Sequence, residues 1–361
     1  MTSHATDLPT TIRAHANDAN EPPVLDLLVV GAGPTGIAIG AEARKVDLAV
    51  LLVDRGPLTA AIQEYPTFLE FFTTRDRLEI AGVPFAIPED KPSRRQALVY
   101  YRSVVDRFQV PLALGEEVIE VRRDPRNPES GTFRVVSRPA LGGGEIVRRA
   151  RSVALATGYW GNPYRLGVPG EDLPWVHCRY REPYPNFGQD VVIVGAGNTA
   201  AEAAVDLWRN GARVTIVHRG AALRAGIKYW LKPDVENRIA EGSIAARFDT
   251  LVEAFLDGGG VAVRSSAGRE VLPAQAAYVL IGYHPDADFE RRCGIEVDPV
   301  TLVPRVDAAT CESNVPGLYV AGTLQAGRKT DLIFIENSRD HGPRIVAHLR
   351  QRLPVEPSSP S

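Results

Sequence analysis

Two glycine-rich hexapeptides in the sequence have the spacing that binds the pyrophosphate of a dinucleotide. In GAGPTG and GAGNTA the three motif positions are Gly31, Gly33 and Gly36, and then Gly195, Gly197 and Ala200. The first glycine of this motif permits a tight turn, the second lets the backbone approach the pyrophosphate, and the third position lets helix pack on strand. The N–H groups and positive dipole end of the following helix favour phosphate. Two such loops predict two dinucleotide sites.

The strand after each loop ends in residues of opposite charge. AVLLVDRG ends in Asp54 and Arg55, whereas RVTIVHRG ends in His218 and Arg219, with Arg224 close behind. Both Asp54 and His218 stand about 20 residues beyond the first glycine, where a side chain meets the adenosine ribose. A carboxylate accepts hydrogen bonds from the ribose hydroxyls and repels a 2′-phosphate, while arginine donates to phosphate oxygens. The first site is therefore predicted to bind FAD and the second NADPH, with hydride transfer between them.

A repeated pattern of elements is needed to position these residues. A strand, a glycine loop and a helix of small and apolar residues occur over 24–46 and again over 190–212. Short alternating strands follow in each half, and then an apolar strand that closes on glycine. This repeat predicts an α/β fold of two Rossmann-like βαβ domains, each with a β-meander. The sequence also predicts a helix over 92–108 that is N-capped by Ser93.

The order of these elements predicts that the NADPH-binding domain is inserted in the FAD-binding domain. A strand and a helix from about Thr330 are expected to return to the first domain after the second is complete. The expected parts are a tail over 1–23, the FAD-binding domain over 24–165 and 285–350, the NADPH-binding domain over 166–284, and a tail over 351–361.

Composition and charge exclude several classes of protein. The 361 residues carry a net charge of −3, with 44% hydrophobic and 24% charged residues, and no polybasic run points to nucleic acid. No apolar run approaches the roughly 18 residues of a membrane helix. The three cysteines are far apart and form neither a disulfide framework nor a CxxC pair. We therefore expect a cytoplasmic protein without a metal site or a membrane partner.

Several segments resemble the flavoproteins related to thioredoxin reductase. ATGYWGNP is similar to the ATG segment of that group, and HRGAALR resembles its HRRxxxR signature for NADPH, with Gly220 replacing the second arginine. Within the group the chain resembles the bacillithiol-disulfide reductases from about Leu25 to Gly342, through FFTTRDRLEIAGVPF, IKYWLKPDVENRI and LIFIENSRDHG. The resemblance implies an NADPH-dependent FAD oxidoreductase that reduces the disulfide of a low-molecular-weight thiol and so serves thiol redox homeostasis. Bacillithiol disulfide is the first candidate substrate.

The loops and the resemblance together assign further residues to the cofactors. Those expected at FAD are Pro34, Thr35, Gly158, Gly322 and Thr323, and those expected at NADPH are Asn198 and Thr199. Thr35 stands where the bacillithiol-disulfide reductases usually have a cysteine, and Thr323 stands where thioredoxin reductases have a flavin-binding aspartate. The missing CxxC excludes reduction of thioredoxin by a resident dithiol.

The candidates for catalysis each have an ordinary structural alternative. Cys178 lies between His177 and Arg179, which could lower its pKa, but a lone cysteine is also a plain small side chain. His341 could donate a proton to a leaving thiolate, or serve as a structural or capping residue. The side chains that could wall the isoalloxazine, or belong to an ordinary core, are Tyr65, Pro66, Phe71 and Phe72.

Three alternative functions stay open beside the disulfide reductase. A ferredoxin or flavodoxin–NADP reductase also lacks CxxC. A flavin monooxygenase has a similar approach to its second glycine loop, although Glu171 and Leu173 replace its expected Phe and Gly. A non-catalytic redox-sensing flavoprotein would bind the same cofactors. We expect a small-molecule disulfide as the substrate and a homo-oligomer as the assembly.

Overall fold

The computed structural model describes residues 23–126 and 131–352, which fold as two compact units. The first unit consists of three parts of the chain: the part up to Gln63, the segment Phe71–Tyr159 and the part from Pro285 onward. The second unit consists of Glu64–Glu70 and Trp160–His284. The second unit thus begins sooner than the predicted 166 and also takes in a segment that the sequence did not assign to it. The predicted tails lie almost wholly outside the described residues.

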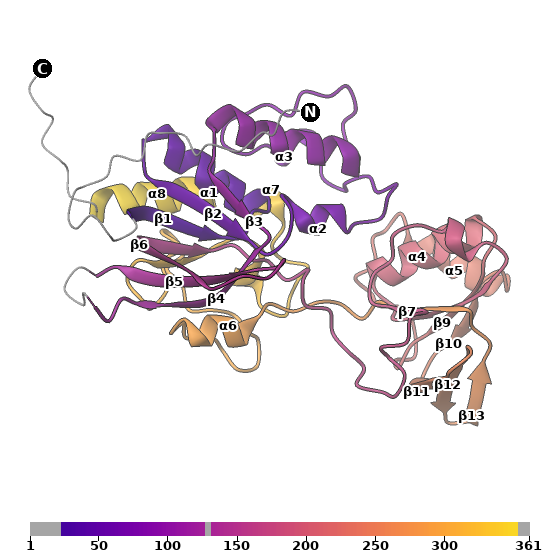
Figure 1. Ribbon diagram of the computed structural model, residues 1–361. Helices are drawn as coiled ribbons and strands as arrows, with labels where there is room; N and C mark the ends of the chain where they lie inside the picture. Colours follow the sequence, from indigo (N-terminus) through magenta and orange to yellow (C-terminus); the bar gives the residue numbers. More distant parts are fainter. Residues whose placement is uncertain (1–22, 127–130, 353–361) are drawn as a thin grey trace, which may run out of the picture. The chain divides into compact units, whose positions relative to one another are not determined.

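A seven-stranded sheet forms the centre of the first unit (Figure 1). Its strands are β1 (Val24–Val30), β2 (Val50–Asp54), β3 (Leu112–Leu114), β4 (Glu116–Arg123), β5 (Phe133–Pro139), β6 (Ile146–Leu155) and β15 (Leu318–Val320). The end of β6 pairs in parallel with β1 and β15, while its beginning pairs antiparallel with β5, which continues to β4. β6 therefore joins a parallel nucleotide-binding sheet to a meander.

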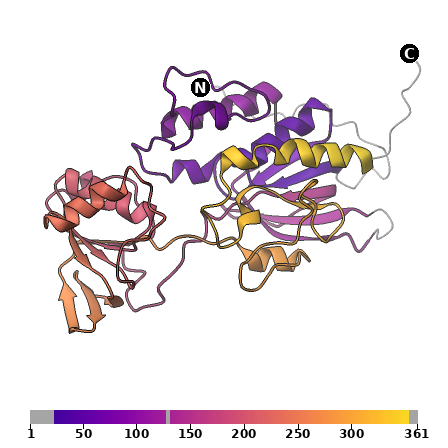
Figure 2. The same cartoon turned by 180° about the vertical axis from the view of Figure 1, so that it is seen from behind.

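Helices cover both faces of this sheet (Figures 1 and 2). They are α1 (Pro34–Lys45), α2 (Ala60–Gln63), α3 (Arg94–Phe108), α6 (Ala287–Arg292), α7 (Ile335–Ser338) and α8 (His341–Arg352), with short 3₁₀ turns η1 (Arg75–Arg77) and η4 (Gly322–Ala326). α1 packs against α3 and α8, and α6 packs against β4 on the other face. The expected strand and helix return to this unit as β15 and α8, but the predicted start near Thr330 is wrong, because the chain first forms the short α7.

The start of α3 follows the sequence prediction, and the tyrosines of the helix are buried. Ser93 and Gln96 form a reciprocal capping box, with the hydroxyl accepting from the Gln96 N–H at 3.3 Å. The buried stripe includes Tyr100, whose ring stacks on Phe85 with centroids 4.1 Å apart.

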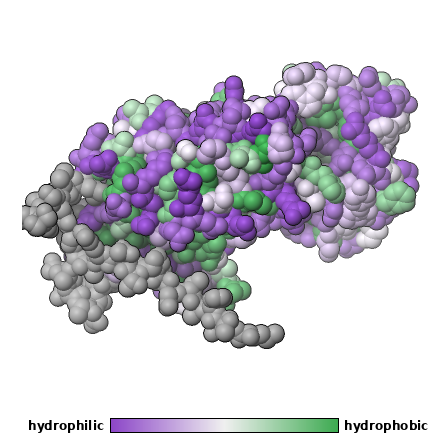
Figure 3. Space-filling model, turned by 90° about the horizontal axis from the view of Figure 1, so that it is seen from above, coloured by the Kyte–Doolittle hydropathy of each residue, from purple (hydrophilic) through white to green (hydrophobic). Residues whose placement is uncertain are grey.

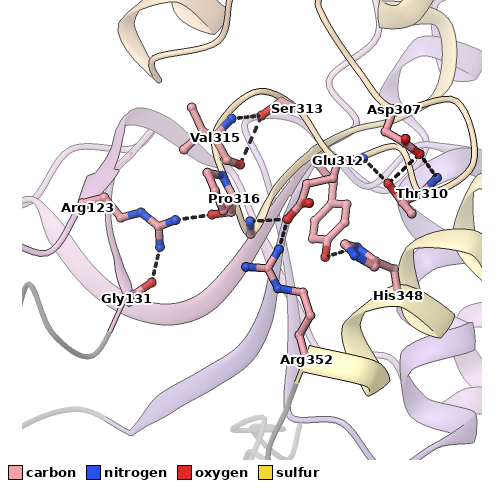
Figure 4. Close-up of polar contacts among 12 residues, drawn as sticks. Arg123, Gly131, Asp307, Thr310, Glu312, Ser313, Val315, Pro316, His348 and Arg352 are labelled. Carbon is pink, nitrogen blue, oxygen red and sulfur yellow. Dashed lines mark hydrogen bonds and ion pairs between the residues drawn. The ribbon is translucent and has the colours of Figure 1, made fainter.

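A polar network fixes the C-terminal end of α8 to the segment that leads into β15 (Figure 4). Glu312 accepts a hydrogen bond from the Gly317 N–H at 2.6 Å and forms an ion pair with Arg352. One helical turn earlier, the His348 Nδ1 lies 3.0 Å from the hydroxyl of the buried Tyr319. These contacts set the position of α8, and with it the position of its first residue.

The second unit repeats the nucleotide-binding plan. Its parallel sheet has the order β10 (Ala245–Arg247), β9 (Arg213–Val217), β8 (Asp190–Val194), β14 (Ala276–Val279) and β7 (Val176–His177). The other elements are α4 (Asn198–Arg209), α5 (Lys232–Ala240), the 3₁₀ turn η3 (Tyr184–Asn186), and an antiparallel sheet of β11 (Leu251–Phe255), β12 (Val261–Ser265) and β13 (Gly268–Leu272). Apolar side chains of the parallel sheet pack on α4 on one side and on the antiparallel sheet on the other.

The predicted fold class is confirmed, since two Rossmann-like units each carry a parallel sheet and an antiparallel extension. No helix in the described part of the chain is long and apolar enough to cross a membrane. Figure 3 shows a face on which hydrophilic side chains predominate and hydrophobic ones form small, separate groups.

Candidate functional site

The first glycine loop connects β1 to α1, and only one of its three glycines has room for a side chain or a ligand beside it. Gly31 has φ +116°, and a β-carbon there would lie 2.4 Å from the carbonyl oxygen of Ala156. A β-carbon at Gly36 would lie 1.9 Å from the carbonyl oxygen of Gly31. At Gly33 a β-carbon would meet nothing within 4 Å. Gly31 and Gly36 therefore lie tightly against other backbone atoms, whereas Gly33 faces open space where a pyrophosphate could approach. These residues fit a dinucleotide.

Asp54 ends β2 and ties that strand to the glycine loop. Its two carboxylate oxygens accept hydrogen bonds from the Ala32 N–H at 2.7 Å and the Gly56 N–H at 2.8 Å. Burial raises the pKa of Asp54, and the two backbone hydrogen bonds and Arg55 oppose this rise. Because an ionised carboxylate can accept about four hydrogen bonds, it keeps capacity for ribose hydroxyls.

Four residues that the sequence assigned to FAD come together from distant segments with the catalytic candidate His341. Gly322 has φ +71°, and a β-carbon there would lie 2.7 Å from the hydroxyl oxygen of Thr35. A β-carbon at Gly158 would lie 3.5 Å from the Thr323 hydroxyl oxygen. The Gly322 N–H donates to Nδ1 of His341 at 3.0 Å. The ends of β6 and β15 and the starts of α1 and α8 thus meet around one turn.

His341 is placed as an acceptor within this turn. Its side chain is 5% exposed, and burial lowers its pKa while Asp340 opposes the shift. Because Nδ1 accepts the Gly322 N–H, the imidazole is neutral and its proton is on Nε2. This geometry gives His341 a structural role and leaves Nε2–H as its one donor.

The second glycine loop connects β8 to α4 and repeats the geometry of the first. Gly195 has φ +136°, and a β-carbon there would lie 2.3 Å from the carbonyl oxygen of Leu280 and 3.4 Å from the Ala200 methyl. At Gly197 the nearest atom to a β-carbon would be Cδ of Arg224, at 4.0 Å. The second loop is therefore open toward the arginine that the sequence assigned to NADPH.

The cations beyond β9 lie on an exposed loop between β9 and α5. Arg219 and Arg224 are exposed, and within the described residues their side chains form no hydrogen bond or ion pair. Burial, together with these two arginines, lowers the pKa of His218. The His218 Nε2 lies only 2.9 Å from where a β-carbon at Gly220 would be. The imidazole fills the space beside the glycine that replaces the second arginine of the HRRxxxR signature.

Asn198 and Thr199 begin α4, and the Asn198 side chain is already engaged by the chain itself. Its Nδ2 donates to the Gly226 carbonyl at 3.3 Å, and its Oδ1 accepts from the Lys228 N–H at 2.9 Å. Thr199 is half-buried in the first turn. The sequence did not single out Glu202 in the next turn. Burial raises the pKa of Glu202 to about 7, with Lys228 opposing.

The neighbours of Cys178 are engaged in contacts of their own. Cys178 is half-buried in the second unit, just beyond β7. An Nη of Arg179 donates to the Trp160 carbonyl at 2.8 Å, and the ring of His177 lies 5.3 Å from that of Tyr278. Burial lowers the pKa of His177. Arg165 interacts electrostatically with the Cys178 thiol, but its guanidinium is also paired with Glu171 and Asp172.

The remaining candidates are divided between the two units. Tyr65 and Pro66 belong to the second unit, where the Tyr65 ring lies edge-on to Trp160 at 4.7 Å, whereas Phe71 and Phe72 belong to the first. The other two thiols are buried in the first unit, and burial raises the pKa of Cys293 to about 12 and that of Cys311 less far.

Two dinucleotide loops, one beside a carboxylate and one beside exposed arginines, define an oxidoreductase that uses a flavin and a nicotinamide nucleotide. The sequence matches the pyridine nucleotide-disulphide oxidoreductase family over residues 28–322, and the chain belongs to that family. The family implies flavin and nicotinamide cofactors.

Its relatives include named disulfide reductases. The chain is 34% identical to the bacilliredoxin reductase Bdr of Bacillus subtilis over 90% of its own length and 97% of that protein. It is similar to the structure of bacillithiol disulfide reductase Bdr from Bacillus cereus, with a TM-score of 0.86 and 32% identity over 91% of this chain and 99% of the other. It is also 27% identical to a ferredoxin–NADP reductase of Ignicoccus hospitalis over 85% and 92% of the two chains.

Proposed function

We propose that this protein is an NADPH-dependent FAD oxidoreductase that reduces the disulfide of a low-molecular-weight thiol, with bacillithiol disulfide as the first candidate. In this reaction NADPH and one proton convert the disulfide into two thiols. The observation that carries the proposal is the contrast between the two loops. One loop is tied to a carboxylate, Asp54, and the other is open toward the unpaired cation of Arg224.

FAD is proposed to bind the first unit. Gly33 would admit the pyrophosphate, Asp54 would accept from the adenosine ribose, and the N-terminus of α1 would face the phosphates. The turn at Gly322 and Thr323, held by His341, would bound the site from β15. When bound, the flavin supplies a two-electron acceptor for the nicotinamide and a donor for the disulfide.

NADPH is proposed to bind the second unit. Gly197 would admit the pyrophosphate at the start of α4, and the exposed guanidinium groups of Arg219 and Arg224 would bind the 2′-phosphate. Burial and the two arginines lower the pKa of His218, which disfavours a charge on that imidazole. The preference for NADPH over NADH is therefore proposed to rest on the two arginines.

The substrate is proposed from the relatives and from the chemistry of this chain. The similar protein of Bacillus cereus is named a bacillithiol disulfide reductase, and that of Bacillus subtilis a bacilliredoxin reductase. At the first glycine loop this chain has Thr35, which cannot form a mixed disulfide. We therefore propose that reduction does not pass through a protein thiol at this loop.

One alternative function has its own support. The similarity to a ferredoxin–NADP reductase favours electron transfer to a ferredoxin or flavodoxin by the same cofactors. Such a reaction would need no substrate thiol and no CxxC pair.

A steady-state assay with a panel of acceptors tests these proposals. NADPH or NADH consumption is followed anaerobically with bacillithiol disulfide, glutathione disulfide, a bacillithiolated bacilliredoxin and ferredoxin, and the thiols formed are titrated. We expect NADPH to be used well above NADH, and two thiols to form for each NADPH consumed with bacillithiol disulfide. Turnover with ferredoxin alone would refute the disulfide reductase and support the alternative.

A further inference from the structure

The loop between β9 and α5, residues 218–231, carries both arginines of the second site and is fastened to the second glycine loop. The Arg224 N–H donates to the carbonyl of Ala196 at 3.0 Å, inside that glycine loop. Asn198, the first residue of α4, adds two further hydrogen bonds to the backbone at Gly226 and Lys228. The loop is thus joined to the pyrophosphate-binding backbone through three hydrogen bonds, two of them made by one side chain.

We propose that Asn198 is a positioning residue for nucleotide selection, which holds the arginine-carrying loop against the second glycine loop so that the enzyme prefers the 2′-phosphorylated nucleotide. The inference rests on the proposed use of NADPH. It goes beyond that proposal because it assigns part of the preference for NADPH to Asn198, whose amide donates one hydrogen bond to the arginine-carrying loop and accepts another from it.

The rest of the loop explains why this fastening matters. Ile227 and Leu231 are buried in the core beside α4, whereas Tyr229 is 83% exposed. The part that precedes Ile227 is held less firmly, since its apolar contact with this core is the partly buried Leu223, and the next residue, Arg224, is exposed. Besides the bonds to the glycine loop, its carbonyl at Gly220 accepts from the Asp249 N–H at 3.0 Å. Asn198 therefore fastens the arginine-carrying part at the end that faces α4.

The two nucleotide classes should respond differently to loss of this contact. Pyrophosphate binding uses backbone N–H groups at the start of α4, which remain when the Asn198 side chain is shortened. Recognition of the 2′-phosphate instead needs the guanidinium groups held in a fixed place, since bidentate pairing depends on geometry. Removing the Asn198 amide should weaken the second interaction and spare the first.

The test compares two probes of the second site, 2′,5′-ADP and 5′-ADP, by isothermal titration calorimetry on the flavin-loaded protein. For Asn198→Ala we expect the Kd of 2′,5′-ADP to rise about tenfold, as for the loss of one or two ordinary hydrogen bonds, while the Kd of 5′-ADP changes less than about twofold. Asn210→Ala is the matched control, since Asn210 makes amide hydrogen bonds to Asp206 at the other end of α4. It should leave both probes unchanged.

The outcomes separate this inference from the proposed cofactor. Unchanged binding of 2′,5′-ADP by Asn198→Ala, or equal weakening of both probes, would overturn the role of Asn198. Wild-type protein that binds the two probes equally would instead overturn the NADPH preference itself, whatever the variant does. If Asn198→Ala proves unstable in thermal unfolding, Asn198→Ser keeps a polar residue at the helix start, and the same selective loss is expected from it.

Discussion

Replacing Gly33 by alanine should weaken FAD binding and leave the apoprotein as stable as the wild type. Gly33 has φ −80° and ψ −179°, a conformation that alanine adopts without strain. A β-carbon there meets no protein atom within 4 Å. The free energy of unfolding should therefore change by no more than about 0.5 kcal/mol.

The methyl group would instead occupy the space that the pyrophosphate needs. Forcing an extra carbon into a close-packed contact costs about 1–3 kcal/mol, so we expect the Kd of FAD to rise roughly 5- to 150-fold. Gly36→Ala is the opposing control, because its β-carbon would lie 1.9 Å from the Gly31 carbonyl oxygen. That variant should lose about 1–3 kcal/mol of apoprotein stability, a fall in Tm of about 2–12 °C.

The assay has two readouts on the same preparations. Apoprotein is prepared from each variant, its thermal unfolding is followed, and FAD is then titrated by fluorescence quenching. Wild-type affinity in Gly33→Ala would show that the backbone does not approach the pyrophosphate at this glycine, and would refute the placement of the cofactor.

Four further predictions follow from single side chains. Arg224→Gln should lower kcat/KM for NADPH about 10- to 100-fold, the value of a charge-assisted hydrogen bond, with kcat/KM for NADH unchanged; parallel kinetics with both nucleotides check this. His341→Leu should lower thermal stability by about 1–3 kcal/mol by orphaning the Gly322 N–H, whereas His341→Asn, which keeps an acceptor, should stay near wild type; an equal loss in both would refute the acceptor role. Burial raises the pKa of Glu290 to about 8, above its ordinary value near 4.5, so stability is lost as pH rises between these values, and the gain in unfolding free energy for Glu290→Gln should grow from pH 5 to pH 8 in denaturant titrations. Cys178→Ser should keep wild-type turnover, because Arg165, which interacts electrostatically with this thiol, is already paired with Glu171 and Asp172; a loss of more than about tenfold would make the thiol a participant.

The glycine loops could be predicted from sequence because their constraints are local. A β-carbon at Gly31 or Gly195 would collide with backbone of a neighbouring segment, and both glycines have positive φ angles. The same spacing therefore signals the same turn in both halves of the chain. The cap at Ser93 was also predictable, since Ser93 and Gln96 are three residues apart.

Features that depend on contacts between distant segments could not be read from the sequence. The acceptor role of His341 needs the turn at Gly322 to be placed by β15 and α8. The break before α8 had a local signal that the sequence reading missed, because Pro343 has no N–H to donate to the Arg339 carbonyl. Upstream, the Asn337 side chain accepts from the Phe334 N–H at 2.7 Å and sets the start of α7.

For some residues, the contacts with other segments of the chain matter more than the residue type from which a role was predicted. Asn198 was assigned to the nucleotide, but its amide is used by the backbone of the arginine-carrying loop. Tyr65 was considered for a flavin wall or an ordinary core, and the structure shows its ring edge-on to Trp160 in the second unit. Both depend on which segments meet, and spacing along the chain does not give that.

The central claim is that electrons pass from NADPH through bound FAD to a small-molecule disulfide. An anaerobic reductive titration tests it most directly: the FAD-loaded protein is bleached with one equivalent of NADPH, and bacillithiol disulfide is then added while the flavin absorbance near 450 nm is recorded. We predict that the absorbance returns and that two thiols form for each flavin reoxidised. A flavin that stays bleached in excess disulfide, yet recovers at once with ferredoxin or air, would contradict the account.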